Sequence, residues 1–335
     1  MKKKFNVGVI GVGHIANKFH IPSFIKNIKI GKVILFDPNK ENLNKTAKKF
    51  NIKLTYTNLN KMFLENKIKI LNICTPPSLH FFHIIKAIEK NINIIVEKPF
   101  VISMSQFKKI KRKILNKNIH CYCAYHQRAR PISQKIKKII DDKKIGEVYY
   151  IKIIHRQYRA IPEHSKYFSQ KKYSGGGPLI DLGTHFFDLV GWFLKFPKIS
   201  KISNNNFNKI TQLKNEKKNL PFKKYDNEEL SIGSFKFDNG CLVDYEISYV
   251  MNTEKKVSSI EIFGTKGSIK WPEGKLLLIK NNKKIIRKIK YNSNLASHLQ
   301  TNDFIKKLKN KFNKIHLDEI EFSINLIEKL YKTKK

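Results

Sequence analysis

The chain has 335 residues, of which 67 are Lys or Arg and 26 are Asp or Glu, so its formal net charge is +41. At roughly 100 to 200 residues per domain this length predicts two domains, and the hydrophobic residues, 41% of the total, are spread along the whole chain, which excludes wholesale disorder. No run approaches the roughly 18 consecutive apolar residues of a membrane-spanning helix, so no membrane partner is predicted.

The first 124 residues alternate short apolar runs with segments of helical periodicity. Five runs rich in Ile and Val are predicted to be strands: 6–12, 32–36, 70–74, 92–96 and 120–124. Three segments with apolar residues three and four positions apart are predicted to be helices: 40–50, 78–90 and 103–116. Because strands that alternate with helices form parallel sheets, residues 1–124 are predicted to be a doubly wound α/β domain.

Beyond residue 124 the sequence predicts a different kind of sheet. Six segments with alternating polar and apolar residues are predicted to be strands: 148–157, 230–237, 241–250, 258–263, 268–271 and 276–279. Turn sequences such as Asp238-Asn239-Gly240 separate them, which indicates antiparallel pairing. Helices are predicted at 133–141, after the glycines 175–177, at 302–310 and at 317–331. Residues 125–335 are therefore assigned to a second α/β domain, in which the Lys- and Asn-rich stretch 204–224 is predicted to be a mobile insertion.

A GxGxxA fingerprint stands between the first predicted strand and the segment that follows it. Gly11 permits a tight turn, Gly13 lets the backbone approach a pyrophosphate, and the helix N-terminus at His14 and Ile15 offers unpaired N–H donors. Asp37 ends the second strand, where a carboxylate can accept both hydroxyls of an adenosine ribose and repel a 2′-phosphate. The pattern predicts a dinucleotide site and favours NAD over NADP, the alternative being an ordinary glycine turn.

Two further strands end in residues that are expected to face one crevice. The Thr75-Pro76 turn and His80 follow the third predicted strand, and Glu97 and Lys98 follow the fourth. In an open parallel sheet the carboxyl ends of the strands line the ligand crevice, so these side chains are predicted to lie near a bound ligand. Lys98 is selected as a candidate because of its position at the end of a buried strand. In a chain this rich in lysine, the alternative interpretation is a solvated lysine at a strand end.

The segment 174–185 carries the densest pattern in the second half of the chain. Three glycines at 175–177 allow the backbone to come close to a ligand, and Pro178 suits the first turn of a helix. Asp181 and His185 are four residues apart and therefore lie on one helical face. A carboxylate and an imidazole directed to the same place are what acid–base catalysis on an alcohol requires. The alternative is a helix cap followed by a structural histidine. No other His, Asp or Cys in this segment completes a set of metal ligands with Asp181 and His185, so no metal site is predicted.

The charge of +41 has two explanations. Clustered Lys and Arg attract polyanions, which would make the chain a nucleic-acid binder. However, nearly all the cations are Lys, and Lys rises together with Asn and Ile in every region, whereas phosphate and base recognition relies on Arg concentrated on one element. We attribute the charge to coding bias, and a nucleic-acid partner is disfavoured.

Cysteine usage bears on the cellular compartment. Cys74, Cys121, Cys123 and Cys241 show neither the spacing of a disulfide framework nor paired CxxC motifs. The basic N-terminus is followed by apolar residues, but glycines interrupt any signal-peptide core, so it is interpreted as the first strand. These features favour a cytoplasmic protein.

Taken together, the motifs resemble those of the glucose-fructose oxidoreductase and inositol dehydrogenase family, Gfo/Idh/MocA. The order of motifs is that of the family: the glycine fingerprint, Thr75-Pro76 with His80, Glu97-Lys98-Pro99, the Gly-rich segment with Asp181 and His185, and a late Phe263-Gly264-Thr265-Lys266-Gly267. The resemblance covers nearly the whole chain, and the combination of the EKP triplet with GGGxxxDxGxH is specific.

The resemblance implies an NAD(P)-binding Rossmann domain over residues 1–124 and a domain for substrate binding and oligomerisation over residues 125–335. The second domain is expected to hold a large open antiparallel sheet. The implied reaction is hydride transfer between NAD and a secondary hydroxyl of a sugar, an inositol or a nucleotide-linked sugar. A small sugar or polyol is the expected partner, and a homodimer or homotetramer is the expected assembly.

Carried over residue by residue, the resemblance makes Lys98 and His185 the acid–base pair and Asp181 the residue that orients the substrate. Contact with the cofactor is implied for Gly11, Gly13, His14, Ile15, Asp37, Thr75, Pro76, His80, Glu97, Lys98 and Arg128. Arg128 matches less closely, because Gln127 stands where the family often has Asn. A neutral imidazole can take the hydroxyl proton near neutral pH, and a lysine can either stabilise the alkoxide or be the base itself, so the identity of the base stays open.

Two alternatives to a dehydrogenase stay open at this point. Some relatives in the family cleave glycosidic bonds through a transient oxidation with a bound, recycled NAD. A catalytically inactive or polyanion-binding relative is the other alternative, although the intact Lys98, Asp181 and His185 argue against lost chemistry.

Overall fold

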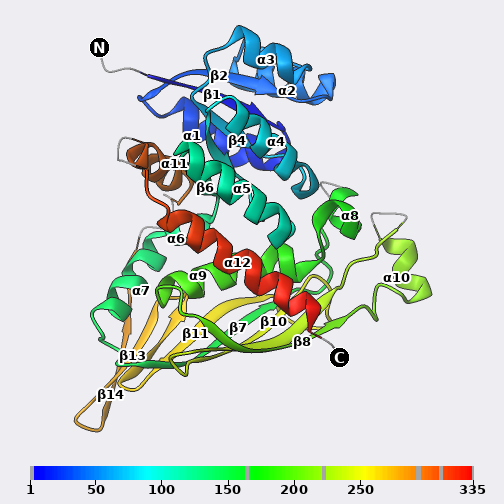
Figure 1. The fold of residues 1–335 in the computed structure, drawn as a ribbon. Helices are drawn as coiled ribbons and strands as arrows, with labels where there is room; N and C mark the ends of the chain where they lie inside the picture. Colours follow the sequence, from blue (N-terminus) through cyan, green and yellow to red (C-terminus); the bar gives the residue numbers. More distant parts are fainter. Residues whose placement is uncertain (1–3, 163–165, 221–223, 292–295, 309–311, 334–335) are drawn as a thin grey trace. The chain divides into compact units, whose positions relative to one another are not determined.

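The computed structural model describes residues 4–162, 166–220, 224–291, 296–308 and 312–333. Backbone contacts divide the chain into two compact units, each with its own sheet (Figure 1). The first unit consists of Met1–Ala124 and Ser297–Ile320, and the second of Tyr125–Ala296 and Glu321–Lys335. The first unit is therefore not continuous in sequence, because a late segment of the chain groups with its beginning.

The first unit is built on a parallel sheet of six strands in the order β3-β2-β1-β4-β5-β6. The strands are β1 (Phe5–Ile10), β2 (Ile30–Phe36), β3 (Thr55–Tyr56), β4 (Ile70–Ile73), β5 (Asn93–Val96) and β6 (Cys121–Cys123). Five of them lie where the sequence predicts strands, and their order is that of a dinucleotide-binding Rossmann sheet. The predicted doubly wound fold is confirmed.

Helices connect the strands of this sheet. They are η1 (Ala16–His20, a turn of π-helix), α1 (Ile21–Ile25), α2 (Lys40–Phe50), α3 (Leu59–Glu65), α4 (Pro77–Glu89), α5 (Met104–Lys117) and α11 (Ala296–Lys307). The Asn39 side chain accepts the N–H of Asn42 at the start of α2, and the hydroxyl of Ser103 caps α5 in the same way. Phe304 and Ile305 of α11 are buried in the core of this unit, which explains why the late segment belongs to it.

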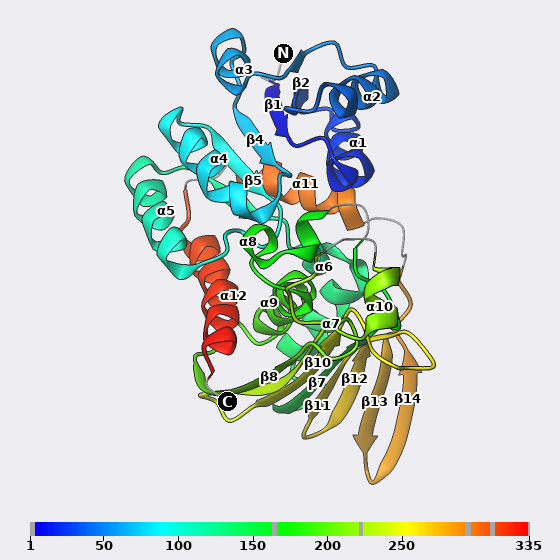
Figure 2. The ribbon, with the colours of Figure 1, turned by 90° about the vertical axis from the view of Figure 1, so that its right-hand side faces the viewer.

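The second unit is built on a sheet of eight strands in the order β14-β13-β12-β11-β7-β10-β9-β8. The strands are β7 (Val148–Arg156), β8 (Ile199–Phe207), β9 (Leu230–Phe237), β10 (Leu242–Ser248), β11 (Val257–Gly264), β12 (Gly267–Trp271), β13 (Lys275–Lys280) and β14 (Lys283–Lys288). All neighbours pair antiparallel except β7 and β10, which are parallel. The predicted antiparallel sheet is confirmed, and the hairpin of β13 and β14 extends past the adjacent strands (Figure 2).

The remaining helices belong wholly or mainly to the second unit. They are α6 (His126–Ala129), α7 (Pro131–Asp141), η2 (Lys166–Ser169, a 3-10 turn), α8 (Lys171–Ser174), η3 (Leu179–Gly183, a π-helical turn), α9 (Thr184–Phe193), α10 (Lys214–Asn219) and α12 (Ile315–Lys332). Side chains of α7, η3, α9 and α12 share one apolar cluster with one face of the sheet. These helices therefore cover that face.

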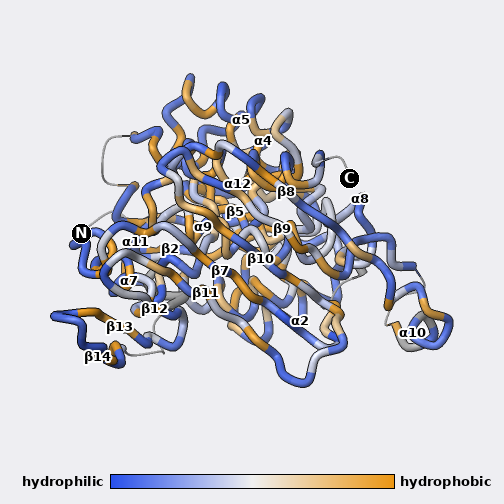
Figure 3. Tube along the Cα trace, turned by 90° about the horizontal axis from the view of Figure 1, so that it is seen from below, coloured by the Kyte–Doolittle hydropathy of each residue, from blue (hydrophilic) through white to orange (hydrophobic). Residues whose placement is uncertain are grey.

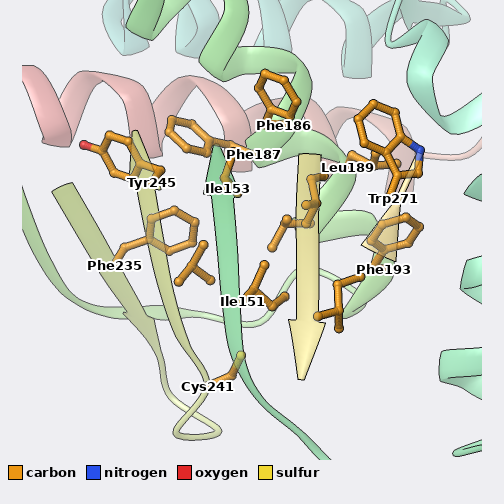
Figure 4. Packing of buried hydrophobic residues seen from close by; sticks show 14 of the residues in the cluster. Ile151, Ile153, Phe186, Phe187, Leu189, Phe193, Phe235, Cys241, Tyr245 and Trp271 are labelled. Carbon is orange, nitrogen blue, oxygen red and sulfur yellow. The ribbon is translucent and has the colours of Figure 1, made fainter. Parts of the chain in front are cut away.

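The core of the second unit follows from the alternation of its strands. Hydrophobic and hydrophilic residues alternate along strands such as β7 and β11 (Figure 3), so one face of the sheet is apolar. On that face Phe187 of α9 packs edge to face against Phe235 and Tyr245 of the sheet, and Phe193 and Ile151 belong to the same apolar cluster (Figure 4). Burial of each such side chain stabilises the fold by roughly 2 kcal/mol, so this cluster fixes where α9 lies.

The prediction of a mobile insertion at 204–224 is wrong over most of the residues that the structure describes there. Residues Ile199–Phe207 form the edge strand β8, and Lys214–Asn219 form α10. Asn204 is buried, and its side chain accepts hydrogen bonds from Ser231 and Tyr245. This part of the Asn- and Lys-rich stretch forms a strand in which the inward-facing amide of Asn204 has polar partners. Residues 221–223 lie outside the described residues, as do 309 and 310 of the helix predicted at 302–310.

Candidate active site

The glycine fingerprint forms the turn between β1 and η1. Gly11 has φ +82°, and a Cβ there would lie 2.9 Å from the backbone of Cys74, so both the conformation and the space require glycine. A Cβ on Gly13 would meet nothing within 4 Å, so open space lies beside its backbone. His14 is exposed and Ile15 half-buried at the start of the helical segment. This arrangement leaves room for a ligand against the backbone at Gly13.

Asp37 lies at the carboxyl end of β2, against this turn. Its Oδ2 accepts the N–H of Val12 at 3.0 Å, and its Oδ1 accepts the N–H of Asn39 at 2.9 Å. Two backbone donors thus fix the carboxylate beside the fingerprint. The predicted preference for NAD over NADP depends on a negative charge at this place.

Thr75 and Pro76 form the turn between β4 and α4. The Thr75 hydroxyl is buried and has no hydrogen-bond partner among the residues that the structure describes. Pro76 immediately precedes the first residue of α4. A buried hydroxyl without a protein partner is a candidate donor or acceptor for a ligand.

His80 is fully buried on α4 and bridges two loops. Its Nδ1 lies 2.8 Å from the carbonyl oxygen of Pro99, and its Nε2 lies 2.8 Å from the carbonyl oxygen of Thr75. Burial lowers the pKa of His80, while the two carbonyls oppose that shift. The cofactor contact implied for His80 stays a prediction, because both ring nitrogens already face the protein backbone.

Glu97 forms a buried ion pair with His20, a residue that the sequence analysis does not single out. Nε2 of His20 lies 2.6 Å from Oε1 of Glu97, and Oε2 accepts the N–H of Lys98 at 3.2 Å. Burial by itself lowers the pKa of His20, but Cys74 and Glu97 raise it, to about 10. Burial also raises the pKa of the Cys74 thiol, while the charge of His20 opposes that shift.

Lys98 thus lies in a loop that is held on both sides. His20 holds the side chain of the residue before it, and His80 contacts the carbonyl of the residue after it. Lys98 itself is half-buried. No spacing rule could have found His20, because its partner is 77 residues away in the sequence.

The second unit carries Asp181 in η3 and His185 in α9. Asp181 is buried, and its Oδ2 accepts a hydrogen bond from the hydroxyl of Tyr249. The ring of His185 meets that of His126 edge to face, with 4.5 Å between their centroids. The structure therefore joins the two sequence-derived residues to Tyr249 and His126, neither of which lies in a motif.

A second histidine of this unit lies near Asp181 on the covered face of the sheet. His155 of β7 is buried, with Nδ1 3.1 Å from the hydroxyl oxygen of Ser258 and Nε2 2.9 Å from the amide nitrogen of Gln157. Burial and the charge of Lys256 lower its pKa to about 4, with Asp181 opposing, so the ring is neutral at pH 7. Both of its ring nitrogens are engaged by Ser258 and Gln157.

Arg128 lies in α6 of the second unit and forms a buried pair. Its Nε and Nη2 donate to the two carboxylate oxygens of Asp188 at 2.7 and 2.5 Å, and its guanidinium stacks on Tyr125 and Phe196. These contacts anchor α6 to α9. The cofactor contact implied for Arg128 stays a prediction.

Within the described ranges, no group of three or more His, Cys, Asp or Glu side chains is placed to hold a metal ion. No helix in the described part of the chain is long and apolar enough to cross a membrane.

Two family models match the chain in succession. Residues 5–125 match a model described as an oxidoreductase family with an NAD-binding Rossmann fold, and residues 133–270 match the GFO/IDH/MocA C-terminal domain. The chain belongs to the Gfo/Idh/MocA family of oxidoreductases. The resemblance found in the motifs is thereby confirmed, and the first unit of this family member is an NAD-binding Rossmann domain.

Characterised proteins with a similar sequence act on sugars and inositols. The chain is 24% identical over 266 residues to D-glucoside 3-dehydrogenase of Escherichia coli (strain K12), which covers 78% of this chain and 75% of the relative. It is 26% identical over 272 residues to scyllo-inositol 2-dehydrogenase (NAD(+)) of Bacillus subtilis (strain 168), covering 80% and 74%.

Solved structures of similar fold include two with bound cofactor. A levoglucosan dehydrogenase in complex with NADH and levoglucosan superposes with a TM-score of 0.80 at 19% identity, covering 98% of both chains. GenD2 from gentamicin A biosynthesis, in complex with NAD, superposes with a TM-score of 0.82 at 18% identity, covering 99% of this chain and 94% of that one. At this identity the structures establish the shared fold.

The residues of the first unit fit a bound dinucleotide. The open space at Gly13, the unpartnered hydroxyl of Thr75 and the fixed carboxylate of Asp37 all lie at the carboxyl ends of β1, β2 and β4. This edge of a parallel sheet is where such folds bind nucleotides.

Proposed function

We propose that the protein is an NAD-dependent dehydrogenase that acts on a secondary hydroxyl of a sugar, an inositol or a nucleotide-linked sugar. Support comes from the family, from the relatives that act on glucosides and inositols, and from the presence of Lys98, Asp181 and His185. The carboxylate of Asp37 carries the preference for NAD, because a 2′-phosphate near it would be repelled.

Proton transfer is the task of the protein's own residues in this reaction. NAD, when bound, supplies the acceptor for the hydride. As the carbinol carbon is oxidised its hydroxyl must lose a proton, and an imidazole, whose ordinary pKa is about 6.5, can accept it near neutral pH. We assign this proton transfer to His185 and Lys98, with two arrangements open: Lys98 as the cation that stabilises the alkoxide, or Lys98 as the base.

Asp181 is assigned the orientation of the substrate. Its carboxylate is buried and accepts a hydrogen bond from Tyr249, which leaves acceptor capacity for a substrate hydroxyl. A carboxylate held in this way can fix the reacting carbon by binding a neighbouring hydroxyl.

The expected assembly is a homodimer or a homotetramer. The face of the second sheet opposite to its core exposes Ile232, Ile279 and Ile286. These side chains are scattered over the sheet, so the expected assembly rests on the resemblance to a family whose open sheet often pairs with its counterpart. Light scattering after gel filtration would measure the mass directly, and a monomer would contradict the proposal.

A calorimetric titration with NADH and NADPH in parallel, at physiological salt, tests the cofactor preference without knowledge of the substrate. We expect tight binding of NADH and binding of NADPH weaker by at least about tenfold, and the Asp37→Asn variant should narrow that difference because the repulsive charge is gone. Equal affinity for both in the wild type would contradict the role of Asp37.

Sugars and inositols would then be screened for NADH formation, and glycoside cleavage without net NADH would identify the NAD-recycling glycosidase instead.

A further inference from the structure

The Gly-rich segment that carries Asp181 and His185 is held by residues far away in the sequence. Oε1 of Glu228 accepts the N–H of Gly177 at 3.0 Å and the N–H of Leu179 at 3.2 Å. Glu228 is buried and stands in the loop before β9. Because residue 178 is a proline, these two N–H groups are the first donors at the start of η3, where a carboxylate is most stabilising.

The C-terminal helix contacts the same oxygen. The hydroxyl of Tyr331, in the last turn of α12, donates to Oε1 of Glu228 at 2.6 Å. Burial and the adjacent charge of Glu228 raise the pKa of Tyr331 well above its usual value, so the hydroxyl keeps its proton at neutral pH. Glu228 therefore joins the last helix of the chain to the start of η3.

Packing excludes side chains from the glycines that lie between these residues. A Cβ on Gly176 would lie 2.1 Å from the hydroxyl oxygen of Tyr331, and a Cβ on Gly177 would lie 2.1 Å from the carbonyl oxygen of Glu228. The approach of a ligand is the explanation that the sequence suggests for these glycines. The structure shows that Tyr331 and Glu228 already require glycine at these two positions.

A backbone hydrogen bond couples the position of Asp181 to that of Gly177. The carbonyl oxygen of Gly177 accepts the N–H of Asp181 at 3.1 Å. Asp181 stands one turn before His185, so both side chains follow the position of the segment that Glu228 holds.

We propose that Glu228 and Tyr331 are positioning residues for Asp181 and His185. They act through the backbone of residues 176–179 and touch neither the substrate nor the cofactor. This inference rests on the proposed function for its catalytic consequence, whereas the restraint of the segment is independent of that function. The last helix of the chain thereby becomes part of the machinery that orients the reacting groups.

Three substitutions separate positioning from general stability. Tyr331→Phe removes the hydroxyl and keeps the ring, and Glu228→Gln removes the charge and keeps the shape. Tyr291→Phe is the matched control, because its hydroxyl also donates one hydrogen bond in the same unit, to the carbonyl oxygen of Pro272 at 3.0 Å. Tyr331→Phe and Tyr291→Phe each lose one hydrogen bond of a tyrosine hydroxyl, and only the substitutions at Tyr331 and Glu228 touch the segment.

Hydrogen exchange followed by mass spectrometry tests the restraint in the full-length protein. We expect peptides that cover residues 175–185 to exchange on the order of tenfold faster in Tyr331→Phe and Glu228→Gln than in the wild type, since the N–H groups of Gly177 and Leu179 lose part of their protection. The same peptides should be unchanged in Tyr291→Phe. Unchanged exchange in both test variants would overturn the proposal, whatever their activity.

Steady-state kinetics test the catalytic consequence. In the two test variants we expect kcat to fall by on the order of tenfold with NADH affinity unchanged, because a small misplacement of reacting groups slows the chemical step. Tyr291→Phe should keep the wild-type kcat even where its melting temperature falls. A kcat that falls equally in all three variants would overturn the positioning role. Wild-type protein that oxidises no sugar or polyol would instead refute the proposed function, and the exchange data would still decide whether the segment is held.

Discussion

At the scale of single residues, Lys98 and His185 carry the proton chemistry of the proposed reaction. We expect Lys98→Met and His185→Ala each to lower turnover by about 10²- to 10⁴-fold, the usual contribution of general acid–base catalysis. NADH affinity should stay close to that of the wild type, because the fingerprint and Asp37 are untouched. Turnover is measured with the best substrate of the screen and binding by calorimetry. Full turnover in either variant would remove that residue from the mechanism.

The ion pair of His20 and Glu97 makes the stability of the protein depend on pH. The pKa of His20 is raised in the folded protein from 6.5 to about 10, so the pair contributes its full stability below pH 6.5 and loses it as the pH rises through about 10. His20→Asn should therefore unfold more easily than the wild type at pH 6, by about 3 kcal/mol, because it removes one partner of a buried pair.

Denaturant unfolding of the wild type and His20→Asn, measured from pH 6 to pH 10, checks this dependence. The difference in unfolding free energy should shrink steadily toward pH 10. His120→Asn is a suitable control, since His120 lies in the same unit without such an ion pair and burial lowers its pKa. A difference that stays constant over the whole range would show that His20 is neutral in the folded protein.

At the scale of elements, the edge strand β8 depends on one buried amide. Asn204 accepts hydrogen bonds from Ser231 and Tyr245, and its Nδ2 donates to the carbonyl oxygen of Leu330 at 3.1 Å, which ties β8 to α12. Asn204→Ala should lower the unfolding free energy by roughly 1 to 3 kcal/mol, because it leaves buried polar groups without partners. Asn205→Ala, next to it on the exposed side of the strand, should change it little. Equal effects of the two substitutions would contradict this role of Asn204.

The same strand shows where the sequence is informative and where it is not. Short Ile- and Val-rich strands such as β4 and β5 are evident because both of their faces are buried. Only the last four residues of β8, 204–207, fall in the Lys- and Asn-rich stretch that is predicted to be mobile, and the buried amide of Asn204 finds its partners only in the folded protein. β3 has only two residues, too few for a periodic signal.

The residues of the candidate site likewise divide into those that the sequence predicts and those that it does not. Motif residues such as Gly11 and Asp181 could be found because turn geometry and helical spacing leave a local signal. His20, Glu228 and Tyr331 could not, because each acts through a partner that is distant in the sequence. The parts of an active site that touch ligand are thus local in sequence, and the residues that hold them are not.

At the scale of the whole molecule, the net charge of +41 opposes compact folding. Carboxylates are too few to neutralise the cations, even though several are engaged in ion pairs such as Lys111–Asp318 and Arg159–Glu216. Repulsion between surface charges is screened beyond a Debye length, which falls from about 30 Å at 0.01 M salt to about 8 Å at 0.15 M. The folded state should therefore be stabilised by salt.

Thermal unfolding at increasing sodium chloride, from about 10 mM to about 500 mM, measures this effect. We expect the melting temperature to rise by several degrees over this range and most of the rise to occur below about 150 mM, where the change in screening is largest. An equal series in sucrose, which stabilises without screening, separates charge repulsion from general exclusion effects. A melting temperature independent of salt would show that the lysines do not repel one another appreciably. Stabilisation by a trace of duplex DNA at 150 mM salt would instead indicate a built polyanion site, because uniformly spread lysines lose most of their attraction for phosphate at that salt concentration.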